Sequence, residues 1–127
     1  MPAARTRSKL ETRLLNQIQA RNLPAPVREF AFAKVLGRRF RFDFAWPDLM
    51  LAVEVHGAVH SMGRHVTGPG FERDREKMNL ALLLGWRVLE VTSGQVGSCK
   101  AISWLSYAIT GQYSGISLKE WIEDPTK

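Results

Sequence analysis

The chain has 127 residues, 45% of them hydrophobic and 24% charged, and this size and composition favour one soluble globular domain. No apolar run approaches the roughly 18 residues that a membrane span needs, and the first residues lack the apolar stretch of a secretory signal. The single cysteine, Cys99, excludes an internal disulfide and a zinc site built from several cysteines. We therefore expect a cytoplasmic protein that binds no membrane.

Basic residues are concentrated in the first third of a chain whose net charge is +6. Residues 1–41 carry ten Lys and Arg side chains against two acids, whereas residues 42–127 carry eight against ten. Such an asymmetry favours a polyanionic partner, of which nucleic acid is the commonest. A charge that serves solubility alone is the alternative.

The N-terminal part of the chain predicts a helix followed by two strands. Ser8 and Glu11 form a capping-box pattern, and the apolar residues after them recur at helical spacing over about residues 8–22. Aromatic residues then recur at every second position around Phe30 and again around Phe42. This spacing predicts two β-strands, each with an aromatic face packed on the core.

The rest of the chain predicts a third strand and a further helix, strand and helix. A nearly continuous apolar run over residues 49–55 is typical of a central strand covered on both sides. The Gly- and His-rich segment 56–70 is long enough for a functional loop. Beyond it we expect a helix over about 71–84, a strand over 86–91 and a helix over about 98–110. The order α-β-β-β-α-β-α predicts an α/β domain around a mixed sheet.

Two acidic residues interrupt the apolar pattern of neighbouring strands. Glu54 lies within the apolar run 49–55, where an unpaired buried carboxylate would cost several kcal/mol, and Asp43 interrupts the preceding aromatic strand. If the turn between these strands is centred on Asp48 and Leu49, Asp43 lies directly opposite Glu54.

This pairing favours a metal site. Facing side chains on adjacent strands have Cβ atoms roughly 5 Å apart, and like charges there repel. A divalent cation relieves the repulsion, and two carboxylates with waters are a usual arrangement for Mg²⁺, often completed by a substrate phosphate. The alternative is two ordinary ion pairs, Asp43 with Arg39 or Arg41 and Glu54 with a nearby arginine.

The acidic pattern resembles that of a known nuclease superfamily. Asp43, followed after ten residues by Glu54 and then by His56, resembles the PD-(D/E)XK motif of restriction-endonuclease-like nucleases, whose core has the order αβββαβ. Three segments more closely resemble the very short patch repair endonucleases and their relatives. They are residues 55–60 (VHGAVH), 72–75 (ERDR) and 84–89 (LGWRVL). The resemblance covers about residues 8–92 and implies a restriction-endonuclease-like core with a mixed central sheet flanked by helices.

The resemblance implies a set of metal ligands. Asp43 would be the principal ligand and Glu54 the second, with the Val55 carbonyl completing the protein's share. Glu11, on the first helix, matches an acidic residue that reaches the site through water or a second metal in many relatives. Its alternative role is the capping box itself.

The resemblance also implies residues for proton transfer. His56 stands where the superfamily usually has lysine and where the patch repair branch has histidine, and His60 resembles that branch's second active-site histidine. Either histidine could orient or deprotonate the attacking water. Lys77, on the expected helix 71–84, is a second candidate for the missing lysine. A solvated helix face is the alternative for Lys77.

The sequence differs from the patch repair enzymes in two features, a zinc-binding cysteine and a cluster of aromatic residues. Ala58 stands near the place of their zinc-binding cysteine, so we expect no zinc. Their cluster of aromatic wedge residues is also missing, so strict mismatch specificity is not expected. We expect one domain over residues 1–127, with a basic tail at 1–7, a core at 8–92 and a C-terminal helical extension at 98–122. The helix of this extension, residues 98–110, offers a surface for a homodimer.

The expected function is a Mg²⁺-dependent DNA endonuclease, with Mn²⁺ as the alternative ion, acting on a nick, mismatch, flap or junction. DNA phosphates would be contacted by the basic residues near the site, which are Arg38, Arg39, Arg41 and Arg64. Two alternatives remain. One is a catalytically inactive nuclease fold that binds nucleic acid, and the other is a basic protein associated with RNA or the ribosome.

Overall fold

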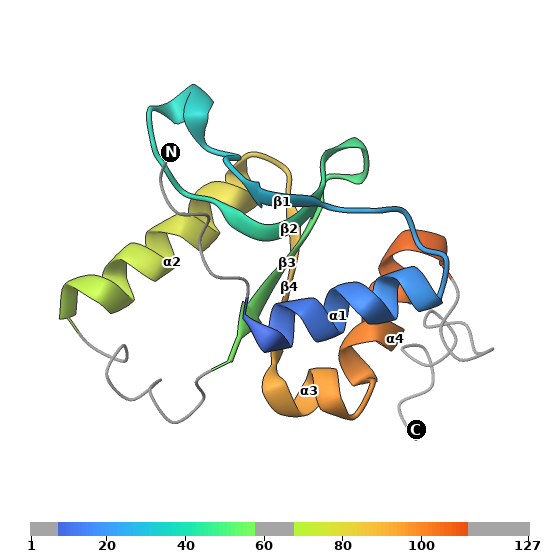
Figure 1. The fold of residues 1–127 in the computed structure, drawn as a ribbon. Coiled ribbons are helices and arrows are strands. Elements are labelled where there is room, and N and C mark those ends of the chain that lie inside the picture. The colour runs from blue at the N-terminus through green and yellow to red at the C-terminus, as the bar shows by residue number, and fades with distance from the viewer. Residues whose placement is uncertain (1–7, 58–67, 112–127) are drawn as a thin grey trace, which may run out of the picture. The chain divides into compact units, whose positions relative to one another are not determined.

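The computed structural model describes residues 8–57 and 68–111 (Figure 1). The chain divides into two compact units: a helical unit, residues 1–24 with 94–127, and a sheet unit, residues 25–93. The described elements form a mixed α/β protein with a four-stranded mixed sheet, which confirms the expected class. Within the described residues, no helix has the length and apolar character needed to cross a membrane.

The sheet unit contains all four strands, in the spatial order β1-β2-β3-β4. Their bounds are Val27–Phe30 for β1, Phe42–Trp46 for β2, Leu51–His56 for β3 and Arg87–Thr92 for β4. The first three strands pair antiparallel, and β3 pairs with β4 in parallel. β3, which carries Glu54, is therefore an inner strand, as its apolar sequence predicts.

The register between β2 and β3 is the one expected from the turn. Phe44 pairs with Val53, and Trp46 pairs with Leu51, on either side of a 3₁₀ turn, η2 (Pro47–Leu49). A proline suits the first position of such a turn because its φ is already fixed near the helical value. The turn thus sets the strand pairing that brings the two acidic positions together.

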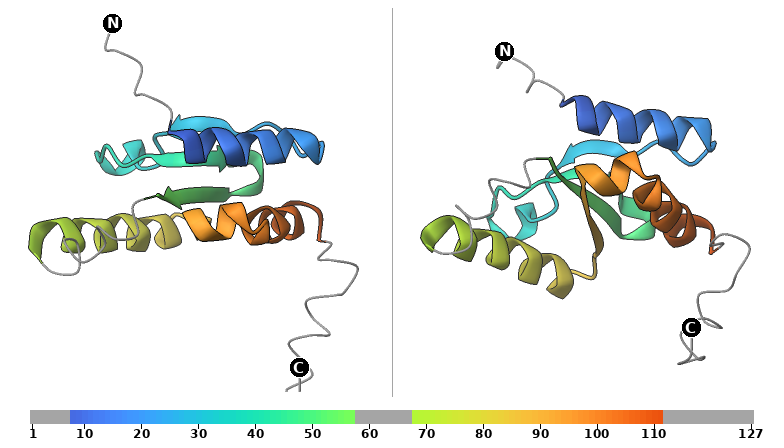
Figure 2. Two further views of the ribbon diagram at one scale, coloured as in Figure 1. Left: turned by 60° about the horizontal axis from the view of Figure 1, so that its bottom comes forward. Right: turned by 90° about the horizontal axis from the view of Figure 1, so that it is seen from below.

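The connection from β3 to β4 contains α2 (Gly68–Leu83), which lies on one face of the sheet (Figure 2). Ala81 of this helix is buried in a cluster that includes Phe42, Ala52 and Trp86. The Phe42 ring stacks on Phe32 with 3.9 Å between centroids and meets Trp86 edge-on at 5.0 Å. This aromatic core fixes α2 against the strands, so that residues one turn earlier on the helix also face the sheet.

The helical unit contains α1 (Lys9–Ala20), α4 (Lys100–Thr110) and most of α3 (Ser93–Gly97). Ser8 caps α1, since its Oγ accepts a hydrogen bond from the Glu11 N–H at 3.0 Å, as the capping-box pattern predicts. Helices α1 and α4 pack together, and the amide of Gln17 donates a hydrogen bond to the Val96 carbonyl at 3.2 Å. The expected tail 1–7 and the part of the C-terminal extension beyond residue 111 lie outside the described residues.

Two short helices were not expected from the sequence. α3 and the 3₁₀ turn η1 (Lys34–Leu36) have too few residues for a helical period to be recognised. The chain passes from α3 to α4 through Cys99, which has a positive φ of 66°. The helix expected over about 98–110 therefore begins two residues later, at Lys100.

Candidate functional site

Asp43 and Glu54 lie where the regular pairing of β2 and β3 stops. The last paired residues are Phe44 and Val53. Beyond them the Asp43 N–H donates a hydrogen bond to Glu54 Oε2 at 2.9 Å, and the Val55 N–H donates to Asp43 Oδ2 at 2.8 Å. Each carboxylate thus satisfies a backbone N–H of the opposite strand that would otherwise lack a strand partner. The two residues thus lie on facing parts of β2 and β3, as the turn predicts, and each side chain forms a hydrogen bond across the gap between these strands.

Glu54 is buried and pairs with a lysine from α2. Its Oε1 accepts a hydrogen bond from the Lys77 ammonium, and the two side chains are 9% and 17% exposed. Burial raises the pKa of the Glu54 carboxyl, an effect that the positive charge of Lys77 opposes. The Lys77 ammonium also lies 5.8 Å from the centre of the Phe42 ring. Lys77 therefore faces the sheet instead of forming part of a solvated helix face, and the ion-pair partner of Glu54 is a lysine.

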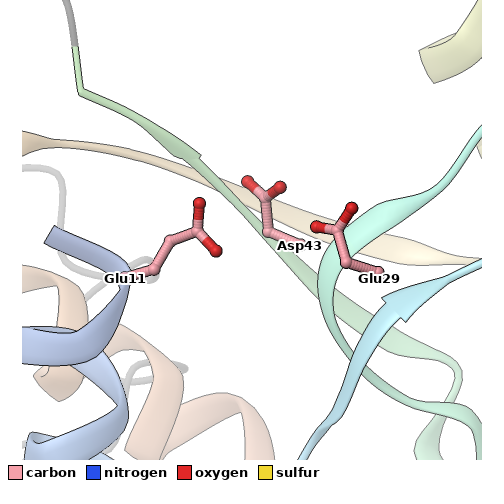
Figure 3. A group of neighbouring side chains, drawn as sticks. All are labelled: Glu11, Glu29 and Asp43. Atoms are coloured by element: carbon pink, nitrogen blue, oxygen red, sulfur yellow. The ribbon is translucent and has the colours of Figure 1, made fainter. Parts of the chain in front are cut away.

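A third carboxylate near the site belongs to Glu29, which was not among the site residues predicted from the sequence. It lies in β1 between Arg28 and Phe30, whose register places it opposite Asp43. Its backbone has a positive φ of 50°, an uncommon conformation for a residue with a side chain. Carboxylate oxygens of Glu29 and Asp43 lie within 4.8 Å of each other, and Figure 3 shows the two carboxylates beside each other. Glu29 stands beside Arg28 in a strand of four residues, so its charge did not mark it as a site residue in the sequence.

His56 contacts an acidic residue of β4. His56 ends β3, and its Nε2 lies 3.1 Å from Glu90 Oε1 of β4, with both side chains exposed. Glu90 was not a candidate, although the parallel register puts it opposite Glu54. Glu11 belongs to the helical unit, so its role at the site stays a prediction. His60 lies outside the described residues, as does Arg64.

The basic residues of the expected DNA contact lie between β1 and β2. Arg39 and Arg41 are exposed. Arg38 forms two hydrogen bonds with the Glu76 carboxylate of α2, one of them 3.0 Å long. Its guanidinium also lies 4.6 Å from the centre of the Phe40 ring. A DNA phosphate that binds Arg38 therefore has to replace or share an existing partner.

The carboxylates of Glu29 and Asp43 lie close enough together to be compared with the ligands of one metal ion. Oxygens bound to one Mg²⁺ each lie about 2.1 Å from it, so they are at most about 4.2 Å apart. Carboxylate oxygens of Glu29 and Asp43 lie within 4.8 Å of each other, which is close to that limit. Glu54 has both oxygens engaged, by Lys77 and by the Asp43 N–H, but a carboxylate oxygen can accept a second partner.

Comparisons of the chain with models of protein families, with curated proteins and with solved structures find no match.

Proposed function

We propose that the protein is a Mg²⁺-dependent DNA endonuclease with a restriction-endonuclease-like core, acting on a structural feature of DNA such as a nick, mismatch, flap or junction. One observation carries the proposal. Asp43, Glu54 and Lys77, which come from three different elements, meet at the point where β2 and β3 separate. Glu54 links the other two residues, because it accepts hydrogen bonds from the Asp43 backbone N–H and from the Lys77 ammonium. Two acids can hold a catalytic metal ion, and a fixed ammonium can offset charge that develops on a phosphate.

The order of the elements supports the proposed family. The described chain runs α1, β1, β2, β3, α2, β4, which is the αβββαβ order of the restriction-endonuclease-like core. The two acids stand on the second and third strands of that order, at the positions that the resemblance assigns to the metal ligands. The lysine comes from α2 instead of from β3, where His56 takes the usual lysine position.

In this proposal Asp43 and Glu54 would hold the metal, with the Val55 carbonyl as a third ligand. When bound there, Mg²⁺ would supply a water of lowered pKa and polarisation of the phosphate. Lys77 supplies a fixed positive charge that offsets the negative charge developing on the phosphate oxygens. His56, in contact with Glu90, is the group available to accept or donate a proton at the open end of β3.

The charge distribution supports DNA as the substrate. Arg38, Arg39 and Arg41 lie in the same unit as the carboxylates and belong to the strongly basic first 41 residues. Contacts of this kind bind the phosphate backbone and carry no sequence information. Arg64, in the segment that follows His56, is the fourth proposed contact.

Nicking of a supercoiled plasmid in Mg²⁺ or Mn²⁺ tests the proposal. We expect the wild-type protein to relax the plasmid, and we expect a chelator or Asp43→Ala to abolish relaxation. Asp48→Ala is the matched control, because it removes an exposed acid at the β2–β3 turn and should leave nicking intact. A wild-type protein that fails to nick in either metal, or an Asp43→Ala variant that nicks normally, would overturn the proposal.

A catalytically inactive DNA-binding protein is the second candidate. The observation that favours it is the Glu54–Lys77 pair, in which the ammonium already compensates the buried carboxylate without a metal. It predicts DNA binding that survives Asp43→Ala, and a melting temperature that Mg²⁺ does not raise. The nuclease proposal predicts a Mg²⁺-dependent rise in melting temperature that Asp43→Ala removes.

A further inference from the structure

Arg38 and Glu76 form a two-pronged ion pair on the surface of the sheet unit. Arg38 Nη2 donates to Glu76 Oε1 at 3.0 Å, and Nη1 donates to Oε2. The hydrogen bonds to Arg38 lower the pKa of the Glu76 carboxyl, so the pair is fully ionised at neutral pH. The side chains are 36% and 44% exposed, which leaves the pair open to a competing partner from solution.

A second guanidinium lies beside the same aromatic ring. The Phe40 ring centre is 4.6 Å from Arg38 Cζ and 6.0 Å from Arg73 Cζ. Arg73 comes from α2, one turn before Glu76, and its charge also acts on the Glu76 carboxyl. Two positive groups from different parts of the chain therefore lie beside one half-buried ring, and the charges of both act on the Glu76 carboxylate. We call Arg38, Phe40 and Arg73 the Phe40 surface.

The carboxylate of Glu76 presents two negatively charged oxygens to Arg38, as a phosphate group does. The planar fork of arginine binds a carboxylate and a phosphate with the same pair of parallel hydrogen bonds. A backbone phosphate can therefore take the two hydrogen bonds that Glu76 now accepts, with Arg73 close enough to add its charge. Because the ion pair is exposed to solvent and screened by ions, replacing Glu76 by another anion at Arg38 costs little free energy.

We propose that the Phe40 surface binds a phosphate of the DNA backbone, and that Glu76 occupies Arg38 in the free protein and is displaced when DNA binds. This inference rests on the proposed function, because it takes DNA as the partner. Glu76 then acts as a built-in competitor that weakens DNA binding. Its removal should strengthen binding beyond what the loss of one negative charge produces.

Binding of a fluorescent DNA duplex to the full chain, measured by anisotropy in the presence of a chelator, tests the inference without requiring cleavage. We expect Glu76→Gln to bind about two- to fivefold more tightly than the wild type, in line with the small strength of exposed ion pairs. Glu72→Gln is the matched control, since it removes an exposed acid one turn earlier on α2 with the same change in net charge. It should tighten binding less.

A double-mutant cycle assigns the effect to Arg38. Arg38→Ala should weaken binding and reduce the slope of log K against log salt by about 0.9, the value for one lost phosphate contact. In the Arg38→Ala background, Glu76→Gln should tighten binding no more than Glu72→Gln does. Equal effects of the two glutamine substitutions in the wild type, or an undiminished Glu76→Gln effect without Arg38, would overturn the inference. A protein that shows the cycle but nicks no plasmid would retain the inference and lose only the nuclease proposal.

Discussion

Two consecutive residues of α2, Glu76 and Lys77, form ion pairs that differ in how far they are buried. Lys77 pairs with Glu54 of β3, and both side chains are largely buried. Glu76 pairs with Arg38, ahead of β2, and both side chains are exposed. The helix thus presents a buried cation to one part of the sheet unit and an exposed anion to another.

Burial decides what each pair can do. A buried ion pair has already lost its hydration, so removing one partner leaves the other charge uncompensated. The Lys77–Glu54 pair is therefore suited to holding fixed geometry at the point where β2 and β3 separate. An exposed pair keeps water at hand and exchanges partners at little cost. The same helix turn can thus serve a rigid candidate site and an exchangeable contact.

Breaking the buried pair should have the largest effect. Lys77→Met keeps the length of the side chain but leaves the Glu54 carboxylate without its cation. We expect the free energy of unfolding at pH 7 to fall by about 3 kcal/mol, at the lower end for buried pairs. Urea unfolding measures this, and Lys34→Met, at an exposed lysine of η1, is the control. Equal stability of the two variants would show that Glu54 is not held by Lys77.

The pH dependence of the Lys77→Met variant sharpens the same test. Burial already raises the pKa of Glu54 above its value of about 4.3 in the unfolded chain, and loss of the Lys77 charge should raise it further. A group whose folded pKa is raised binds more protons in the folded state, so stability falls as pH rises through that window. The deficit of the variant should therefore be smaller at pH 5 than at pH 8, and Glu54→Gln should remove this difference.

The contrast also shows how far the sequence could lead. The register that places Asp43 opposite Glu54 was predictable because a short turn containing a proline joins β2 and β3. The buried position of Lys77 could not be predicted, because this residue stands in the charged run 72–77. The packing of Ala81 in the core fixes which side of α2 faces the sheet.

Two further carboxylates were missed for different physical reasons. Glu29 interrupts the two-residue alternation of its strand through a positive φ, which no residue pattern around it signals. Glu90 meets His56 through the parallel register of β3 and β4, and a long crossover leaves that register open in the sequence. Local turns are thus readable from the sequence, whereas pairings between distant elements are not.

The His56–Glu90 pair offers an intermediate effect, because it is exposed like Arg38–Glu76 but adjoins the candidate site. Glu90→Gln should change the free energy of unfolding by no more than about 0.5 kcal/mol. It should lower kcat for plasmid nicking more than it raises KM, because Glu90 orients a proton-transfer group and binds no phosphate. Asp48→Asn, which removes the charge of an exposed acid in η2, is the control. A loss confined to KM would contradict the orienting role.

The smallest effect is expected from the exposed pair itself. Glu76→Gln should leave the melting temperature at pH 7 in 0.15 M salt almost unchanged, because the lost attraction is screened by water and ions. Lys77→Met should lower the same melting temperature by roughly 10 °C, from its expected loss of stability. Glu76 has a lowered pKa, so any stability it adds is present above the ordinary carboxyl pKa and is lost as pH falls through the lowered value. If Glu76→Gln lowered the melting temperature as much as Lys77→Met, the exposed pair would contribute substantially to stability. Displacement of Glu76 by a DNA phosphate would then cost too much free energy for the proposed exchange.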